Sequence, residues 1–270
     1  MINDLRCELS FKNLDQLKNK LEFCLNNQIY KFNIPCKGEI KKEFLLKVIN
    51  YIDNHYKNID VTYHFSFYHQ FTKNKQTSYQ NFINFIDICG VNKNKKILLV
   101  SGSTKKKNFE VVNVLNDFKN YFPRDVNFGV VYNPYYQTKE DNLLERARLK
   151  EKLNSGLINS IWLQFGSDIK ALSREIKFLK KYIETNFDNK IEIYGSLFVP
   201  SKQFLARFKF RPWKNVFLSN EYLNSIDHSI FISKSILNLY LVNNICPLVE
   251  TECSNLKQLE DTKKLFYYKF

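Results

Sequence analysis

The chain has 270 residues, of which 44% are hydrophobic, so it can bury the core of one large domain or of two small ones. No run approaches the roughly 18 apolar residues of a membrane span, and the start lacks the apolar segment of a signal peptide, so we expect a cytoplasmic protein with no membrane partner. The net charge of +14 would permit anionic ligands or nucleic acid, but the lysines are spread over nearly every predicted helix, and we expect no nucleic-acid binding.

Eight β-favouring runs alternate along the chain with segments of helical periodicity. Apolar residues repeat at helical spacing in three of these segments, which begin near Leu14, Leu45 and Leu172. The predicted strands are 5–11, 30–36, 60–67, 96–101, 126–133, 160–165, 190–199 and 215–219, and the weaker predicted helices are 77–89, 109–121, 141–155, 201–208 and 220–244.

Strict alternation of strand and helix favours a parallel sheet, and eight such units in about 250 residues favour a closed (β/α)8 TIM barrel. No linker or low-complexity segment divides the chain. We therefore predict one domain, 1–270, with the barrel at about 5–245 and a C-terminal extension, 246–270, that packs across one barrel end.

Functional groups of such barrels lie at the carboxyl ends of the strands. The side chains expected there are polar and nearly uncharged. They include no carboxylate pair of the glycosidase type and no convincing Ser/His/Asp order. The six cysteines have no paired spacing, so we predict no metal site. A set of polar, nearly uncharged side chains at the strand ends suits a polar, planar organic ligand held by hydrogen bonds.

Three motifs in chain order carry a resemblance to a known family. They are YNPYYQ at 132–137, RLKEKLNSG at 148–156 and LQFGSD at 163–168, and their order and spacing resemble those of methylenetetrahydrofolate reductase. RCELSF, which contains Glu8, falls where that family has its strand-one glutamate. The resemblance covers the whole barrel in order, and its most specific motifs lie between 98 and 168.

The resemblance implies hydride transfer between NAD(P)H, a flavin (FAD) and a folate substrate in one-carbon metabolism and methionine biosynthesis. It implies that Glu8 is the catalytic acid and that Gln164 and Asp168 contact the substrate. The residues that it places near the cofactor are His64, Ser66, Ser101, Gly102, Ser103, Tyr132 and Lys152.

Two positions depart from the family pattern. The family's Arg-Gly-Asp after strand four is Ser101-Gly102-Ser103 here, and the glutamate of its Tyr-Pro-Glu motif falls within 134–137, which holds none. These changes leave two alternatives beside the reductase: a non-catalytic or flavin-independent folate-binding barrel and, more remotely, a basic nucleic-acid-binding protein. Barrel enzymes often pair, so a homo-oligomer is possible.

Each candidate also has a purely structural interpretation. Glu8 can pair with a lysine, and Gln164 can satisfy backbone groups at the barrel rim. His64 can be a hydrogen-bonded core histidine. Around 194–223, Arg207, Arg211 and Trp213 fit either a phosphate site or an aromatic core, and the second interpretation is favoured.

Overall fold

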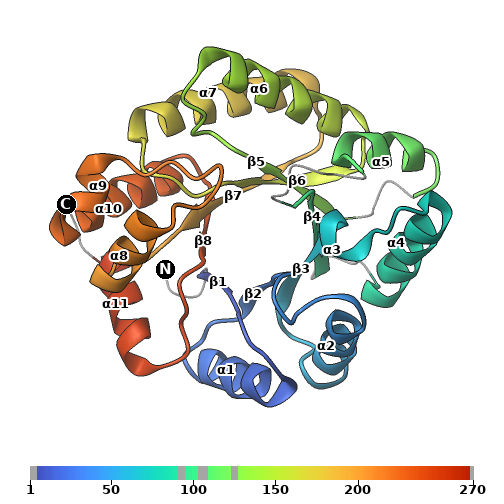
Figure 1. Cartoon of the computed structure of the whole chain (residues 1–270), viewed down its shortest axis with the longest axis horizontal. Helices are drawn as coiled ribbons and strands as arrows, with labels where there is room; N and C mark the ends of the chain where they lie inside the picture. Colours follow the sequence, from blue (N-terminus) through green and yellow to red (C-terminus); the bar gives the residue numbers. More distant parts are fainter. Residues whose placement is uncertain (1–4, 91–94, 103–108, 123–126, 268–270) are drawn as a thin grey trace.

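The computed structural model describes residues 5–90, 95–102, 109–122 and 127–267. Eight parallel strands pair in sequence order, and the last pairs with the first, so the sheet is closed into a barrel (Figure 1). The (β/α)8 prediction is confirmed. The strands are β1 (Arg6–Glu8), β2 (Lys31–Ile34), β3 (Asp60–Ser66), β4 (Lys95–Val100), β5 (Phe128–Tyr132), β6 (Ile158–Leu163), β7 (Glu192–Leu197) and β8 (Cys246–Val249).

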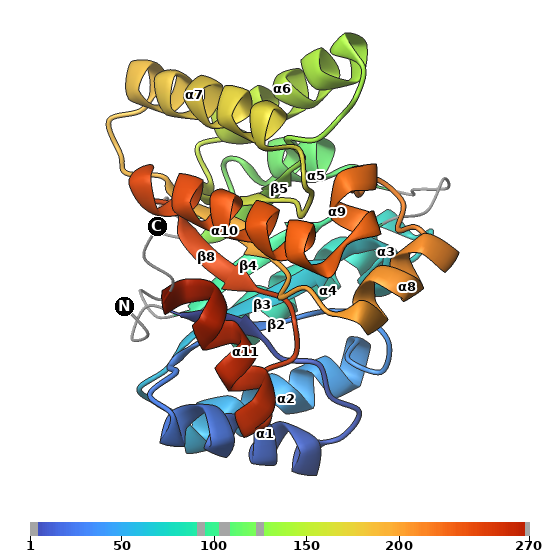
Figure 2. The same ribbon diagram turned by 90° about the vertical axis from the view of Figure 1, so that its left-hand side faces the viewer.

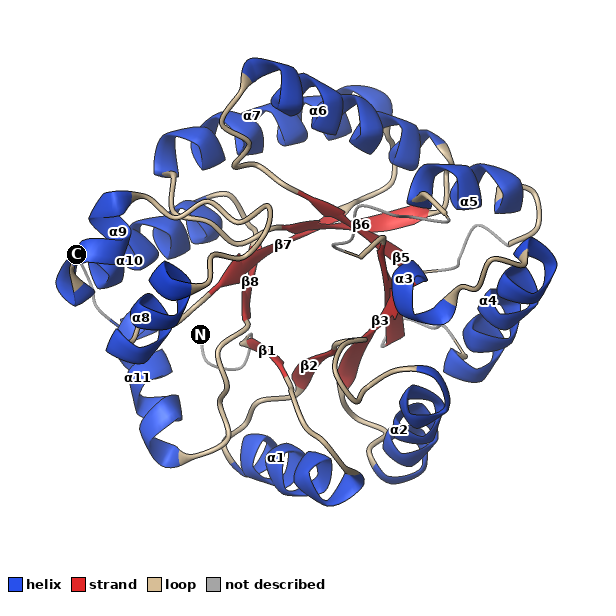
Figure 3. Ribbon diagram, viewed as in Figure 1, coloured by secondary structure: helices blue, strands red, loops and turns tan. Residues whose placement is uncertain are grey.

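Helices form a ring around the outside of the barrel, as Figure 3 shows. Their apolar faces cover the outward-facing side chains of the strands, such as Phe32 and Val249. The helices are α1 (Leu14–Asn26), α2 (Lys42–His55), α3 (Phe67–Gln70), α4 (Lys75–Cys89), α5 (Val111–Phe118), α6 (Lys139–Asn154), α7 (Ile169–Asn186), α8 (Lys202–Phe210), α9 (Asn220–Asn224), α10 (Ile226–Val242) and α11 (Leu256–Tyr267).

Local sequence sets the ends of several helices. The side chains of Asn13, Thr138 and Asp168 each accept a hydrogen bond from a backbone N–H in the first turn of α1, α6 and α7. After α6, Gly156 has φ +74°, a left-handed conformation that glycine adopts without steric cost, and its N–H donates to the Leu153 carbonyl at 3.0 Å. Ser225 ends α9 and caps α10, so the predicted helix 220–244 is two helices.

The predicted eighth strand, 215–219, is wrong. Cys246–Val249 forms β8 instead, and it pairs with both β7 and β1. The 215–219 segment lies against the loop after β6, where the Phe217 carbonyl accepts from the Ser167 N–H at 3.0 Å. Its apolar run resembled a strand because it covers the loops at the mouth of the barrel.

This correction also moves the C-terminal boundary of the barrel. The predicted limit at 245 omits the last βα unit, because β8 and α11 both come after it. Figure 2 shows α11 in the ring of helices, between α10 and α1. The segment predicted as an extension therefore closes the barrel.

The amino-terminal half of the barrel interior, called the floor below, is filled by a charged and aromatic cluster. Arg6 is 1% exposed, forms an ion pair with Asp60 at 2.5 Å and donates to the Phe32 carbonyl at 2.9 Å. Its guanidinium lies over the rings of Trp162 and Tyr194, which stack at 3.9 Å. Lys96 adds an ion pair with Glu192 at 3.2 Å. These described side chains pack the floor, whereas a cavity lies at the opposite end of the barrel.

Candidate functional site

The carboxyl-terminal end of the barrel, called the mouth below, holds a cavity of about 790 Å³. This is the end at which barrels of this type place their functional groups. Residues from β1, β3, β4 and the segments after β2, β5 and β6 line it. Of the residues predicted from the sequence, the cavity brings together Glu8, His64, Ser66, Ser101, Gly102, Lys152 and Gln164.

Glu8 supplies a buried carboxylate at the base of this cavity. Its side chain is 6% exposed, and its Oε1 accepts a short hydrogen bond from the ammonium of Lys37, which follows β2 and is 58% exposed. Burial acts to lower the pKa of Lys37, but attraction to Glu8 and their hydrogen bond outweigh it and raise that pKa. The cavity therefore contains a Glu8–Lys37 ion pair.

A second carboxyl group lies beside Glu8, and the sequence analysis missed it. Register pairs Arg6 with Leu248 and Cys7 with Val249, so Glu8 and Glu250 follow next to each other on β1 and after β8. Glu250 continues the sheet, because its N–H donates to the Leu197 carbonyl at 3.0 Å. The misplaced eighth strand hid this neighbour, and the ring of strand ends does contain two adjacent carboxyl groups.

Burial and the nearby charge of Glu8 raise the pKa of Glu250 to about 7. A hydrogen bond with Ser196 and the charge of Lys37 act in the opposite direction but do not cancel this effect. Near neutral pH, Glu250 therefore retains its proton to a substantial extent. A carboxyl group that is partly neutral near pH 7 can act as a proton donor in acid catalysis.

His64 is a neutral hydrogen-bonding group in the wall of the cavity. Burial lowers its pKa to about 4. Arg6 donates to the Asn33 amide oxygen at 3.2 Å, which turns the amide nitrogen of Asn33 toward His64 Nε2 at 3.0 Å. Nε2 thus accepts a hydrogen bond, so the ring proton is on Nδ1. Asn33 connects the floor of the barrel to its mouth.

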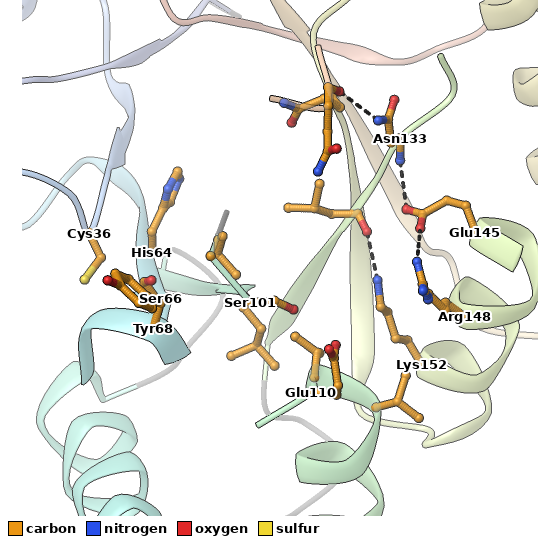
Figure 4. Close-up of a pocket in the computed structure, with 18 of the residues that line it drawn as sticks. Cys36, His64, Ser66, Tyr68, Ser101, Glu110, Asn133, Glu145, Arg148 and Lys152 are labelled. Carbon is orange, nitrogen blue, oxygen red and sulfur yellow. Dashed lines mark hydrogen bonds and ion pairs between the residues drawn. The ribbon is translucent and has the colours of Figure 1, made fainter. Parts of the chain in front are cut away.

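The wall next to His64 is formed by Ser66, Ser101, Gly102 and Tyr68 (Figure 4). Gly102 has φ +90°, and a Cβ there would lie 2.5 Å from the Cβ of Tyr68. Close packing against Tyr68 and the positive φ both require glycine. Ser103 lies outside the described residues.

The opposite wall carries amides and cations from the segment after β5 and from α6 (Figure 4). The Asn133 N–H donates to Glu145 at 3.1 Å, and Arg148, with a 58% exposed side chain, lies 3.9 Å from that same carboxylate. Lys152 donates to the Val131 carbonyl at 3.1 Å. The backbone N–H of Gln164 continues the sheet by donating to the Tyr132 carbonyl at 2.8 Å. Gln164 also lines the cavity.

Two predicted residues lie away from the cavity. Tyr132 is 1% exposed and donates from its hydroxyl to Glu175 of α7 at 2.6 Å, where Arg146 and Arg174 also bind that carboxylate. It faces the helices, because side chains alternate along a strand and Val131 faces the cavity. Asp168 caps α7, accepting from the Ala171 N–H at 2.9 Å, and lines a separate hollow of about 430 Å³.

The 194–223 region forms an aromatic cluster. Trp213 packs against Phe198, Phe204 and Phe208 at centroid distances of 5.3 to 5.8 Å. Ser219 caps α9 by accepting from the Tyr222 N–H. The aromatic-core interpretation holds for Phe208, which is buried, but not for Phe210 and Trp213, which are 93% and 43% exposed.

Two further groups of predictions concern metals and membranes. Within the described ranges, no three His, Cys, Asp or Glu side chains are placed to hold a metal ion, and the six cysteines are free thiols. Among the described helices, none combines the length and apolar character that crossing a bilayer requires.

The chain matches no protein-family profile and no curated protein. Among solved structures, it is similar to an uncharacterised protein from Clostridium thermocellum that binds two copies of 5-methyl-5,6,7,8-tetrahydrofolic acid. The two share 16% identity with a TM-score of 0.66, over 97% of this chain and 92% of the other. A weaker match, N2152 from Neocallimastix frontalis, has 10% identity and a TM-score of 0.45, over 86% of this chain and 64% of that one. The first similarity shows that the two chains have the same fold.

Proposed function

We propose that this protein binds a reduced folate in the cavity at the mouth of the barrel. The observation that carries the proposal is the arrangement of charge, with a buried carboxylate, Glu8, at the base and cations on the wall formed by α6. The structural neighbour that binds 5-methyltetrahydrofolic acid supports it, since its barrel covers almost the whole chain.

A reduced folate has complementary groups at its two ends. The pyrimidine edge of its pterin presents an N–H and an amino group side by side, and a carboxylate such as Glu8 can accept from both. Its glutamate tail is anionic and matches Arg148 and Lys152. The neutral His64 and the amide of Gln164 add hydrogen-bonding groups between these ends.

Calorimetric titration with 5-methyltetrahydrofolate tests the proposal. We expect saturable binding, and we expect p-aminobenzoylglutamate, which has the tail without the pterin, to bind at least about tenfold more weakly, because it leaves the buried carboxylate unused. Glu8→Gln should weaken folate binding but leave p-aminobenzoylglutamate binding unchanged. Glu221→Gln, at an exposed position of α9, is the matched control. Equal affinity for the two compounds would contradict the proposed orientation.

A second candidate function is reduction of methylenetetrahydrofolate, which the motif resemblance implies. The specific observation in its favour is a carboxyl group that keeps a proton near neutral pH, Glu250, beside the predicted acid, Glu8. In the free protein Glu8 forms an ion pair with Lys37. An acid role for Glu8 therefore requires that substrate binding separate this pair.

The donor set of the cavity fits a flavin. His64, Ser66 and Ser101 present neutral hydrogen-bonding groups to a ring, and Arg148 and Lys152 present cations suited to phosphates. A bound flavin would carry hydride from NAD(P)H to the folate. The visible absorption spectrum of the purified protein, before and after addition of FAD, tests this candidate. A colourless protein that takes up no FAD would contradict the flavoenzyme and leave the binding proposal intact.

A further inference from the structure

Glu250 occupies a position that none of the predicted roles uses. It follows β8 on the inner side of the barrel, because Leu248 packs inside with Leu98, Trp162 and Tyr194, and alternate residues of a strand share a face. Glu8 shares that orientation on β1, two residues beyond Arg6, which lies over the Trp162 and Tyr194 rings. The closure of the barrel thus places the two carboxyl groups on neighbouring strands, facing the same interior.

Among the residues that the structure describes, the groups around this pair provide one positive charge for two carboxyl groups. From the segment after β2, Lys37 binds Glu8 directly and is also attracted by Glu250. From β3, His64 is neutral, since burial lowers its pKa to about 4. From α10, Tyr240 is neutral, because burial raises the pKa of its hydroxyl, which donates to the Ser196 carbonyl at 3.2 Å. Ser196 of β7 offers Glu250 an uncharged hydroxyl.

With Lys37 as the one cation beside the pair in the described ranges, ionising both carboxyl groups would leave one negative charge without a cation. Adjacent carboxyl groups avoid this repulsion by sharing one proton. Lys37 pairs directly with Glu8, which leaves Glu250 as the member that carries the proton.

We propose that Glu8 and Glu250 form a carboxyl pair that holds one proton, with Glu250 protonated and Glu8 in its ion pair with Lys37, so that the pair presents one negative charge instead of two. This inference rests on the proposed function only for the identity of the ligand. Glu250 acts through Glu8 and is a positioning residue. A ligand with two adjacent donors and no charge at that end, such as a pterin edge, matches one carboxylate better than two.

Infrared titration of the ligand-free protein tests the inference directly. A protonated carboxyl group absorbs in a C=O stretching band that an ionised carboxylate lacks. We expect the wild-type protein to lose one such band with a midpoint near neutral pH. Glu250→Gln should abolish this transition, and Glu260→Gln, at an exposed position of α11, should leave it unchanged. An amide has the shape of a protonated carboxyl group, so Glu250→Gln is expected to fold.

Lys37→Met gives a second, independent variant. Without its cation the pair should hold its proton more tightly, and the midpoint of the transition should move to higher pH. A transition that survives in Glu250→Gln, or a midpoint that Lys37→Met leaves in place, would overturn the inference. If the transition behaves as expected but 5-methyltetrahydrofolate does not bind at any pH, the carboxyl pair stands and the proposed function fails.

Discussion

The floor and the mouth of this barrel both contain buried charges, but they use them differently. At the floor, Arg6 is surrounded by groups of the protein itself, including Asp60, the Phe32 carbonyl and two aromatic rings. At the mouth, Glu8 is also buried, but its ion-pair partner is an exposed lysine, Lys37, and it lines a cavity of about 790 Å³. Charges at the floor are neutralised within the fold, whereas the mouth leaves acceptor capacity for a ligand.

This difference predicts which substitutions change stability and which change ligand binding. Removing one member of a buried, ion-paired cluster leaves its partners without compensation, so it costs stability. Replacing a group that faces a cavity leaves few protein partners behind, so it changes binding instead. Substitutions at the two ends of the barrel should therefore separate stability from ligand affinity.

The largest effect is expected for Arg6→Met. The change leaves Asp60 without its closest cation and removes donors to Phe32 and Thr62, so we expect a loss of about 3–5 kcal/mol in the free energy of unfolding. Urea denaturation measures it. Arg207→Met, at an exposed position of α8, is the control and should cost less than about 0.5 kcal/mol. Equal stability of the two variants would contradict the view that the buried charges of the floor stabilise the fold.

Glu8→Gln is expected to show the opposite pattern. Its hydrogen bond to a ligand would lose the charge, which corresponds to a roughly 10- to 100-fold loss of affinity for 5-methyltetrahydrofolate. The free energy of unfolding should change by less than about 1 kcal/mol, since the Lys37 side chain is more than half exposed. Denaturation and calorimetry on the same sample measure both quantities. A large loss of stability with unchanged affinity would make Glu8 a structural residue.

The pH dependence of stability should distinguish Glu250 from other carboxyl groups. Its pKa in the folded protein, about 7, is above the 4.5 of an ordinary glutamate, so the folded state binds this proton more tightly than the unfolded state. The resulting stabilisation is complete below pH about 4.5 and is lost as the pH rises through about 7. Melting temperatures should therefore fall relative to those of Glu250→Gln over this range. Parallel curves for the two proteins would contradict the assignment.

The smallest effect is expected for Tyr132→Phe. The variant loses one hydrogen bond to Glu175, which keeps Arg146 and Arg174, so the cost should be about 1 kcal/mol in the free energy of unfolding. Binding of folate or flavin should not change, because this side chain faces the helices. A selective loss of ligand affinity would restore the cofactor role that the motif implied.

The sequence was sufficient for most of the fold because strand and helix periodicity are local properties. Seven strands lie within a few residues of their predicted positions. The eighth failed because a four-residue strand that begins with an exposed Cys246 and contains a proline has a weak local pattern, whereas 215–219 has a strong apolar one. Pairing with distant strands identifies β8, since its partners lie about 50 positions away on β7 and about 240 positions away on β1.

The same error limited the prediction of the site. Glu8, His64 and Gln164 were placed at the mouth from strand ends alone, and the structure gathers them there. Glu250 was missed because its neighbour, Glu8, is adjacent only through barrel closure. Tyr132 was assigned to the cofactor by motif, whereas strand alternation directs it outward. The motifs did not show which residues of each strand point into the cavity and which point outward into the core beneath the helices.

A crystal structure of the protein with 5-methyltetrahydrofolate would test the central claim most directly. The account predicts the pterin inside the barrel mouth, with its N–H and amino group within hydrogen-bonding distance of Glu8, and the glutamate tail toward Arg148 and Lys152. A ligand bound outside this cavity, or one with its tail carboxylates directed at Glu8, would contradict it.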